Sequence, residues 1–338
     1  MATVAVVGGG LLELGLRAFA PVLPSWLSIY SLHPRLPYSL QASAARRVDT
    51  GVTQWTVVTD EDRLRIGVAG PVPRAEPHWL AIGDSFAFGH GVDAEEGLIG
   101  CLEAETGVRI ANAAIPGFGP TQYRAMLAEH LDRNGLCGVV VVAYLGNDFH
   151  DALWDKSVAI HDGILGLKPG WKGVIQRRSH VYRFLTNALH RLDFGARSAT
   201  PALEADLMSA DRWSSFLDAA EPAWIEAYRG LYDLAATRGI PVVVIVLPNR
   251  AAVDEAMFRK IDAARAGNIE TLDPTLARVK AGEWIERAGL RVIDATDSLL
   301  QVKDARFLPF DGHFTGAVNA QLARSLAGPV SSALQRSN

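Results

Sequence analysis

Short apolar runs alternate with segments of helical periodicity along most of the chain after residue 78. The run at 139–143 is an uninterrupted Val-Val-Val-Val-Ala, which is typical of a strand covered by helices on both faces. Strands that alternate with helices in this way predict a doubly wound parallel sheet. The predicted strands cover 79–82, 108–112, 139–143, 241–247 and 291–294, and the predicted helices cover 97–106, 122–134, 223–237 and 315–326.

The first part of the chain, 1–77, follows a different pattern. Residues 2–12 are uncharged and mostly apolar, and Glu13 and Arg17 then interrupt an apolar run that continues to about residue 27. The uncharged run is too short to span a bilayer, which takes about twenty residues. A helix whose Glu and Arg lie four residues apart can still lie at a membrane interface, because the two charges neutralise each other.

Two interpretations of this N-terminal helix remain open. We favour membrane association or export, which makes the cell envelope the expected location. The alternative is an ordinary helix packed on the domain, with a cytoplasmic location. Residues 53–58 and 63–68 read as two strands of a β-hairpin, and the proline-rich stretch 70–77 reads as a linker to the domain at 78–330.

An insertion at about 149–221 separates the third and fourth predicted strands. Apolar residues at 158–160 and 164–167 flank Asp162-Gly163, which predicts a tight hairpin turn. Residues 174–192 read as one helix with an apolar stripe and an opposite face that carries Arg177, Arg178, Arg183 and Arg191. We favour a solvated basic face over a contact with an anionic ligand or a membrane. The insertion could form a lid or a wall of the substrate site.

Composition and charge exclude several classes of protein. The 338 residues are 49% hydrophobic and 21% charged, which excludes a disordered chain. A formal net charge of −4 lacks the basic character of a general nucleic-acid binder. Two cysteines, Cys101 and Cys137, cannot form a disulfide scaffold or a cysteine-rich zinc site. Seven further histidines show no paired ligand spacing, so no metal site is expected: His33, His78, His90, His130, His161, His180 and His190.

Polar residues set among glycines follow three consecutive predicted strands. Ser85 lies between Gly83 and Gly89, Gly117 follows the second strand, and Asn147 follows the third. Ligands of open parallel sheets bind outside the carboxyl ends of the strands, so these loops are expected to converge. Near the C-terminus, Asp311 and His313 precede the last predicted helix.

These residue types match the requirements of acyl transfer. A serine hydroxyl needs a base to take its proton, and histidine is suited to that near neutral pH. A carboxylate then orients the imidazole, and N–H donors stabilise the oxyanion. We assign Ser85 as nucleophile, His313 as base and Asp311 as orienting acid. The oxyanion donors are the Ser85 and Gly117 N–H groups and the Asn147 side chain.

The order of these blocks resembles that of the SGNH (GDSL-type) hydrolases. The blocks are Gly83-Asp84-Ser85, Gly117, Gly146-Asn147-Asp148, and Asp311 with His313. The resemblance covers about 78–330 and implies a flavodoxin-like three-layer α/β/α sandwich. It also implies action on esters, with neither a metal nor an organic cofactor, and a role for Asp84 in shaping the turn.

One position departs from the family pattern. The family commonly places the Asp three residues before the His, whereas Asp311 lies two residues before His313. Asp304 or a backbone carbonyl could therefore orient the imidazole instead. His150 and Asp151 closely follow Asn147 and either line the pocket or lie on the surface.

Three functional hypotheses follow. The first is a serine esterase that removes an acyl group, such as acetyl, from a carbohydrate or another small ester. The second is an O-acyltransferase that modifies cell-envelope polysaccharide through the same Ser85 acyl-enzyme. The third is a non-catalytic glycan-binding protein that keeps the fold. The sequence determines neither the acyl chain, the alcohol nor the oligomeric state.

Overall fold

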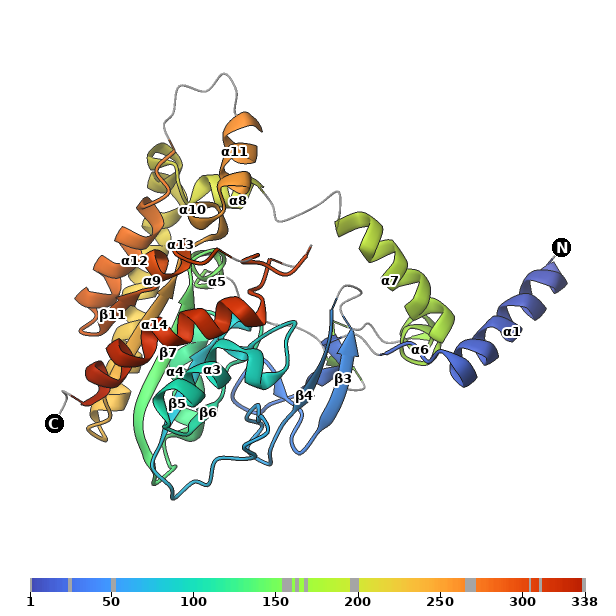
Figure 1. Ribbon diagram of the computed structural model, residues 1–338, viewed down its shortest axis with the longest axis horizontal. Helices are drawn as coiled ribbons and strands as arrows, with labels where there is room; N and C mark the ends of the chain where they lie inside the picture. The colour runs from blue at the N-terminus through green and yellow to red at the C-terminus, as the bar shows by residue number, and fades with distance from the viewer. Residues whose placement is uncertain are drawn as a thin grey trace.

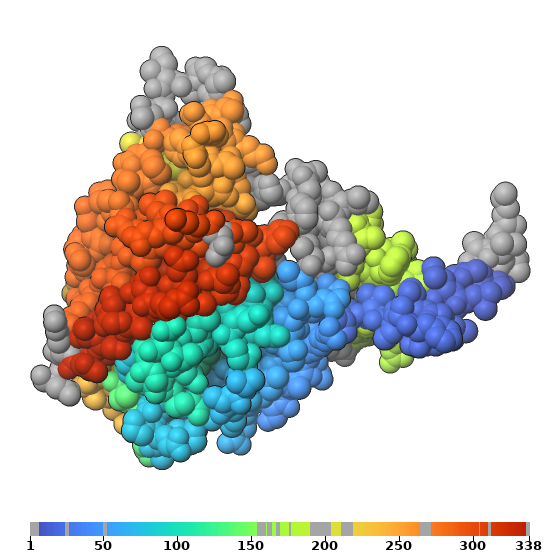
Figure 2. Space-filling model, in the orientation of Figure 1, coloured from blue at the N-terminus to red at the C-terminus, as the bar shows by residue number. Residues whose placement is uncertain are grey.

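The computed structural model describes residues 2–23, 26–49, 53–153, 160–161, 164–166, 170–194, 201–264, 272–303, 305–309 and 312–335. Figure 1 shows a sheet wrapped by helices, a small β segment beside it, and a projecting group of helices near the N-terminus. The projecting helices extend well beyond the body of the molecule in the space-filling view of Figure 2.

Five parallel strands form the central sheet in the order β11-β10-β7-β5-β6. In chain order this is the 2-1-3-4-5 arrangement of flavodoxin-like folds, so the predicted fold class is confirmed. The residues of β7 from Gly138 to Ala143 and those of β10 from Val243 to Leu247 are buried, as their apolar sequences require. The strands are β5 (His78–Gly83), β6 (Ile110–Asn112), β7 (Leu136–Tyr144), β10 (Val242–Leu247) and β11 (Arg291–Asp294).

Helices cover both faces of the sheet and complete three layers (Figure 1). On one face α3 (Leu98–Thr106) packs against α14 (Gly316–Gln335). On the other, α9 (Ala210–Ala236) lies between α4 (Pro120–His130) and α12 (Leu276–Arg287).

Both α9 and α14 are longer than the sequence pattern predicts. Each contains an internal proline, Pro222 in α9 and Pro329 in α14. Burial of the adjacent Trp224 and Val330 accounts for the continuation, because the packing gained outweighs the backbone hydrogen bond that each proline removes.

The N-terminal segment forms a hairpin, but not the predicted one. β4 (Gln54–Val58) pairs antiparallel with β3 (Ala45–Asp49). Residues 63–68 form no strand, and Arg65 makes only isolated bridges to Thr59 and Asn112. The reason is that this segment turns into the α/β body. The Arg65 guanidinium, though cationic, is buried and donates to main-chain carbonyls there.

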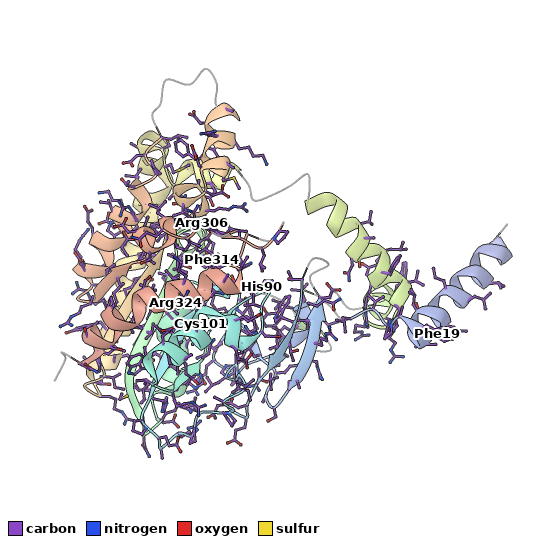
Figure 3. The ribbon with its side chains drawn as sticks, in the orientation of Figure 1. Phe19, His90, Cys101, Arg306, Phe314 and Arg324 are labelled. Carbon is purple, nitrogen blue, oxygen red and sulfur yellow. The ribbon has the colours of Figure 1, made fainter. Side chains whose placement is uncertain are left out.

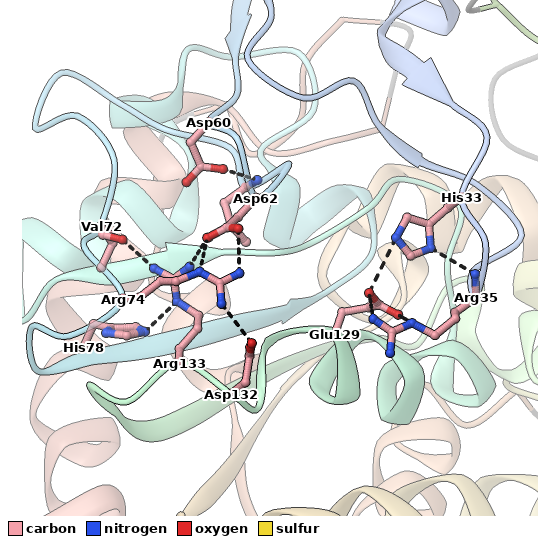
Figure 4. Close-up of polar contacts among 11 residues, drawn as sticks. His33, Arg35, Asp60, Asp62, Val72, Arg74, His78, Glu129, Asp132 and Arg133 are labelled. Atoms are coloured by element: carbon pink, nitrogen blue, oxygen red, sulfur yellow. Dashed lines mark hydrogen bonds and ion pairs between the residues drawn. The ribbon is translucent and has the colours of Figure 1, made fainter.

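A network of ion pairs joins the N-terminal segment to the body (Figure 4). The Arg133 side chain is buried and donates to Asp62 at 2.6 Å and to the His78 ring at 3.0 Å. Asp62 also pairs with Arg74 at 2.7 Å. Apolar side chains of both parts belong to one continuous core, including Tyr30, Leu40 and Trp55 from the N-terminal segment.

The insertion after β7 consists of short elements and helices. β8 (Ile160–His161) and β9 (Ile164–Leu165) pair antiparallel, while the predicted turn residues 162–163 lie outside the described residues. The prediction of a single helix at 174–192 is wrong. Two helices, α6 (Trp171–Arg178) and α7 (His180–Phe194), are separated by Ser179, which has an extended backbone.

The remaining elements are short or lie at the edges of the body. Among the described parts of the chain, no helix has both the length and the apolar character that crossing a bilayer requires. The helices and strands not yet described are α1 (Ala2–Phe19), η1 (Trp26–Ile29), β1 (Tyr30–Ser31), β2 (Ser39–Leu40), α2 (Ser85–Phe88), η2 (Ala94–Glu96), α5 (Asp148–Asp151), α8 (Pro201–Asp206), α10 (Arg250–Val253), α11 (Glu255–Ala264) and α13 (Thr296–Leu300).

Replacement of Arg65 by Met should destabilise the fold. The substitution keeps much of the side-chain volume but leaves buried carbonyls of the body without their donor, so the free energy of unfolding should fall by about 3 kcal/mol. Urea denaturation followed by circular dichroism measures the change. Arg47→Met on exposed β3 is the matched control, with an expected change within about 0.5 kcal/mol. Equal stability of the two variants would contradict this role of Arg65.

Candidate functional site

Ser85 lies at a sharp turn from β5 into α2. A Cβ at Gly83 would lie 2.7 Å from both the Ala87 Cβ and the Val142 carbonyl oxygen, so only glycine fits there. The Asp84 side chain caps α2 by accepting from the Phe86 N–H at 2.8 Å. Ser85 is half-buried, whereas its neighbours in the turn are buried. The turn therefore presents the Ser85 hydroxyl at the carboxyl end of the sheet.

Side chains from outside the turn hold α2 in place. Arg65 donates to the Phe88 carbonyl, to the Gly89 carbonyl at 2.7 Å and to the Val92 carbonyl at 2.7 Å. Asn112, at the end of β6, donates to the Ala87 carbonyl at 3.0 Å. Burial lowers the pKa of Arg65 to about 10, which leaves the guanidinium charged at neutral pH.

His313 lies in a turn that is closed by backbone pairing. The Leu308 N–H donates to the His313 carbonyl at 2.7 Å, and the Thr315 N–H donates to the Arg306 carbonyl at 3.2 Å. The Arg306 side chain anchors the turn by donating to the Leu299 and Val302 carbonyls, each at 3.0 Å. This arrangement fixes His313 just before α14.

The structure brings Ser85 and His313 together. The Nε2 of His313 lies 2.7 Å from the Ser85 Oγ, across 228 positions of sequence. This is a hydrogen-bond distance, and a neutral imidazole with its proton on Nδ1 accepts the serine proton in this arrangement. The pair can therefore activate the hydroxyl as a nucleophile.

Aromatic rings surround the imidazole of His313. Phe86 lies 4.8 Å from it between ring centroids and stacks on Tyr144 at 3.8 Å. The His90 ring centroid lies 4.6 Å from that of His313 and 4.8 Å from that of Trp55 of β4. His90 and Phe314 are labelled in Figure 3. The sequence offered no signal for His90, because its neighbours Trp55 and His313 are far away in the chain.

Asn147 lies between two carboxyl groups. Its Nδ2 donates to Asp151 Oδ2 at 2.9 Å, and its side chain also interacts with Asp84. A Cβ at Gly119 would lie 2.6 Å from the Asp151 Cβ, so the loop after β6 packs closely on the end of α5. The loops that carry Ser85, Gly117 and Asn147 thus adjoin, as the sequence predicts.

Gly117 needs its lack of a side chain. Its φ is +83°, and a Cβ there would lie 2.7 Å from the Tyr38 hydroxyl. Tyr38 itself donates to the Pro116 carbonyl at 2.9 Å. Burial and the nearby Asp151 raise the pKa of the Tyr38 hydroxyl, which remains protonated. A residue of the N-terminal segment therefore shapes this loop, which the sequence did not indicate.

The predicted orienting acids cannot be placed. Asp311 and Asp304 both lie outside the described residues. Of the other candidates, Asp151 is buried beside Asn147, and His150 is half-buried with its pKa lowered by that burial. Within the described parts of the chain, no group of three His, Cys, Asp or Glu side chains is arranged to hold a metal ion. The catalytic roles assigned from the sequence remain predictions.

Asp84 should make stability depend on pH. Burial raises its pKa from 3.8 to about 6, against the opposing effects of the Phe86 N–H, His313 and Asn147. The folded protein therefore binds the proton more tightly than the unfolded chain does. This contribution to stability is present below pH 3.8 and is lost as the pH rises through about 6.

Asp84→Asn should remove that dependence. Between about pH 4.5 and about pH 7, the loss of unfolding free energy should be about 2 kcal/mol smaller in the variant than in the parent. Urea denaturation at the two pH values measures the difference. Asp233→Asn, on the exposed side of α9, is the control and should follow the parent. An identical pH profile for Asp84→Asn would show that Asp84 is ionised throughout.

Comparisons with known proteins give distant likenesses only. No family model and no curated protein matches the sequence. A protein of the lipolytic G-D-S-L family from Desulfitobacterium hafniense shares 11% identity at a TM-score of 0.41, over 75% of this chain and 99% of that one. TesA shares 14% identity at 0.40, over 76% and 99%. An acetylxylan esterase variant from Geobacillus stearothermophilus shares 13% at 0.38, over 77% and 95%. Likenesses this distant assign no function to the chain.

Proposed function

We propose that this protein is a serine-dependent ester hydrolase that works through an acyl-enzyme on Ser85. The observation that carries the proposal is the 2.7 Å distance between Ser85 Oγ and His313 Nε2. A structural serine has no need of a half-exposed histidine held by a separate backbone-paired turn. The four sequence blocks that resemble SGNH hydrolases support the same chemistry.

The reaction consists of two acyl transfers. Nε2 of His313 takes the Ser85 proton as Oγ bonds to the ester carbonyl carbon, and the carbonyl electrons move onto its oxygen. The tetrahedral intermediate collapses by breaking the ester C–O bond, and His313 returns the proton to the departing alcohol. Water then attacks the acyl-enzyme by the same route, releases the acid and restores Ser85.

Three donors are proposed for the oxyanion. The Ser85 N–H lies in the first turn of α2, where N–H groups have no acceptor within the helix. The Gly117 N–H lies in the adjoining loop, at a position where the Tyr38 hydroxyl leaves no room for a Cβ. The Asn147 amide is oriented by its hydrogen bond to Asp151, and its second N–H, which contacts Asp84, is the donor proposed for the oxyanion. Donors held in place in this way stabilise charge that develops only in the transition state.

The substrate is proposed to be a small or carbohydrate ester that carries a short acyl group such as acetyl. A sugar hydroxyl in place of water would make the same acyl-enzyme an O-acyltransferase. The geometry of Ser85 and His313 serves both acceptors, so the two activities differ only in how the acyl-enzyme is consumed.

Ser85→Ala should abolish the hydrolysis of p-nitrophenyl acetate. Removal of the nucleophile should lower kcat/KM by at least about 10⁴-fold, and labelling by a fluorophosphonate probe should disappear. Ser325→Ala, at an exposed position of α14, is the matched control and should keep both signals. Hydrolysis at the parental rate by Ser85→Ala would disprove the assignment. If the parent protein forms no adduct but retains glycan binding, it is a non-catalytic binder.

The fate of the acyl group separates hydrolase from transferase. Intact-protein mass spectrometry with a panel of acyl donors should show an adduct on the parent and none on Ser85→Ala. We expect water to remain the main acceptor when a polysaccharide is added, with free acid as the dominant product. Transfer of most of the acyl group to the polysaccharide would assign the protein as an acyltransferase.

A further inference from the structure

Three helices form an arm that stands away from the α/β body. We call α1, α6 and α7 the helical arm. Figure 1 shows these helices on one side of the molecule, and Figure 2 shows α1 and α7 extending past the body. Because the sheet and its covering helices lie elsewhere, the arm receives little of the burial that the core provides.

Polar contacts hold the arm together from within. The Glu13 carboxylate of α1 accepts from the Ser179 hydroxyl at 2.8 Å and from the His180 and Val181 N–H groups at 2.9 Å each. These are donors at the start of α7, where a carboxylate is favoured. Arg17 in turn donates to the Arg178 carbonyl at 2.7 Å. Of the two charges that interrupt the apolar N-terminal run, Glu13 thus joins α1 to α7 and Arg17 joins α1 to α6.

Large apolar side chains remain exposed on all three helices. Phe19 is 90% exposed, Trp171 is 70% exposed and Leu189 is 61% exposed. Soluble monomers rarely leave so many large apolar groups close together on one part of the surface. Phe19 is labelled on the arm in Figure 3. The other exposed members are Val7, Leu11, Leu12, Leu14, Val174, Ile175, Tyr182, Phe184 and Leu185.

The charge of the arm is opposite to that of the protein. Over α1, α6 and the part of α7 up to Leu189, the basic residues are Arg17, Lys172, Arg177, Arg178 and Arg183, and Glu13 is the one acid. The whole chain has a formal net charge of −4. Basic side chains next to exposed Trp, Tyr, Phe and Leu are the composition of helices that lie in a membrane interface.

We propose that the helical arm binds the surface of a bilayer that contains anionic lipids, with its helices lying in the interface. The apolar side chains would enter the boundary between headgroups and acyl chains, and the basic side chains would meet lipid phosphates. A second copy of the chain fits less well, because two such arms would bring like charges together. The inference is independent of the ester hydrolysis proposed above.

Vesicle flotation tests the proposal on the full chain. The protein should float with phosphatidylcholine vesicles that contain phosphatidylglycerol, with an affinity at least about tenfold higher than for phosphatidylcholine alone. Raising the salt from roughly 50 mM to roughly 500 mM should weaken the binding, because salt screens exposed charges. Failure to float with anionic vesicles at low salt overturns the proposal.

Paired variants separate the apolar and the electrostatic contributions. Phe184→Ser with Leu185→Ser should weaken binding about tenfold or more. Lys172→Glu with Arg178→Glu should also weaken binding about tenfold or more, and should remove most of its salt dependence. The matched controls outside the arm are Val68→Ser with Val279→Ser and Arg46→Glu with Arg238→Glu, at exposed positions. All variants should keep the circular dichroism spectrum of the parent, which verifies folding. Equal loss of binding in the arm variants and in these controls contradicts the proposal.

Two further measurements distinguish a lipid bilayer from a second copy of the chain as the partner that the helical arm binds. Brominated lipids should quench the Trp fluorescence of the parent, and Trp171→Phe should remove most of that quenching while the protein still binds. Quenching that is unchanged in Trp171→Phe would contradict insertion by α6. Light scattering after size exclusion should show no dimer without lipid. A dimer that the Phe184 and Leu185 substitutions dissociate would assign the surface to a second copy of the chain instead.

Discussion

The turn from β5 into α2 is the constraint on which the candidate site depends. No Cβ fits at Gly83, because the Val142 carbonyl and the Ala87 side chain already occupy that space. β5 is also paired on both sides, with β6 and with β7, so the turn cannot shift without moving the sheet. The packing of the core around β5 therefore fixes the position of Ser85. His313 has only to be held against a hydroxyl that is already fixed.

Side chains of the N-terminal segment contact the residues and loops that form the candidate site. Arg65 ties the end of α2 through main-chain carbonyls, Trp55 packs on His90 behind His313, and Tyr38 lies over Gly117. Ion pairs such as that of the buried Arg133 with the half-buried Asp62 join the segment to the body, and both parts share one core. A change in this segment would therefore reach the serine and the histidine through packing.

Carboxyl groups determine the electrostatics around Ser85 and His313. Asp84 lies buried beneath the turn and interacts with His313 and Asn147, and Asp151 holds the Asn147 amide. An ionised Asp84 would stabilise the positive charge that His313 gains in the proton transfer proposed from Ser85. Because burial opposes that ionisation, the protein maintains a balance between the stability of the fold and the charge of the site.

The alternation of strands and helices, the sheet class and the meeting of Ser85 with His313 could be predicted from the order of residues alone. Apolar runs report burial, and the loops after parallel strands must share one edge. Three features became visible only in the folded chain: the pairing of β4 with β3, the division of a helix at Ser179, and the approach of distant side chains to the site. These side chains are Arg65, His90 and Tyr38. Local periodicity records which residues are buried, but not which distant residues pack against one another. Glu13 illustrates the difference, since an interruption of the apolar pattern became the cap of a helix far along the chain.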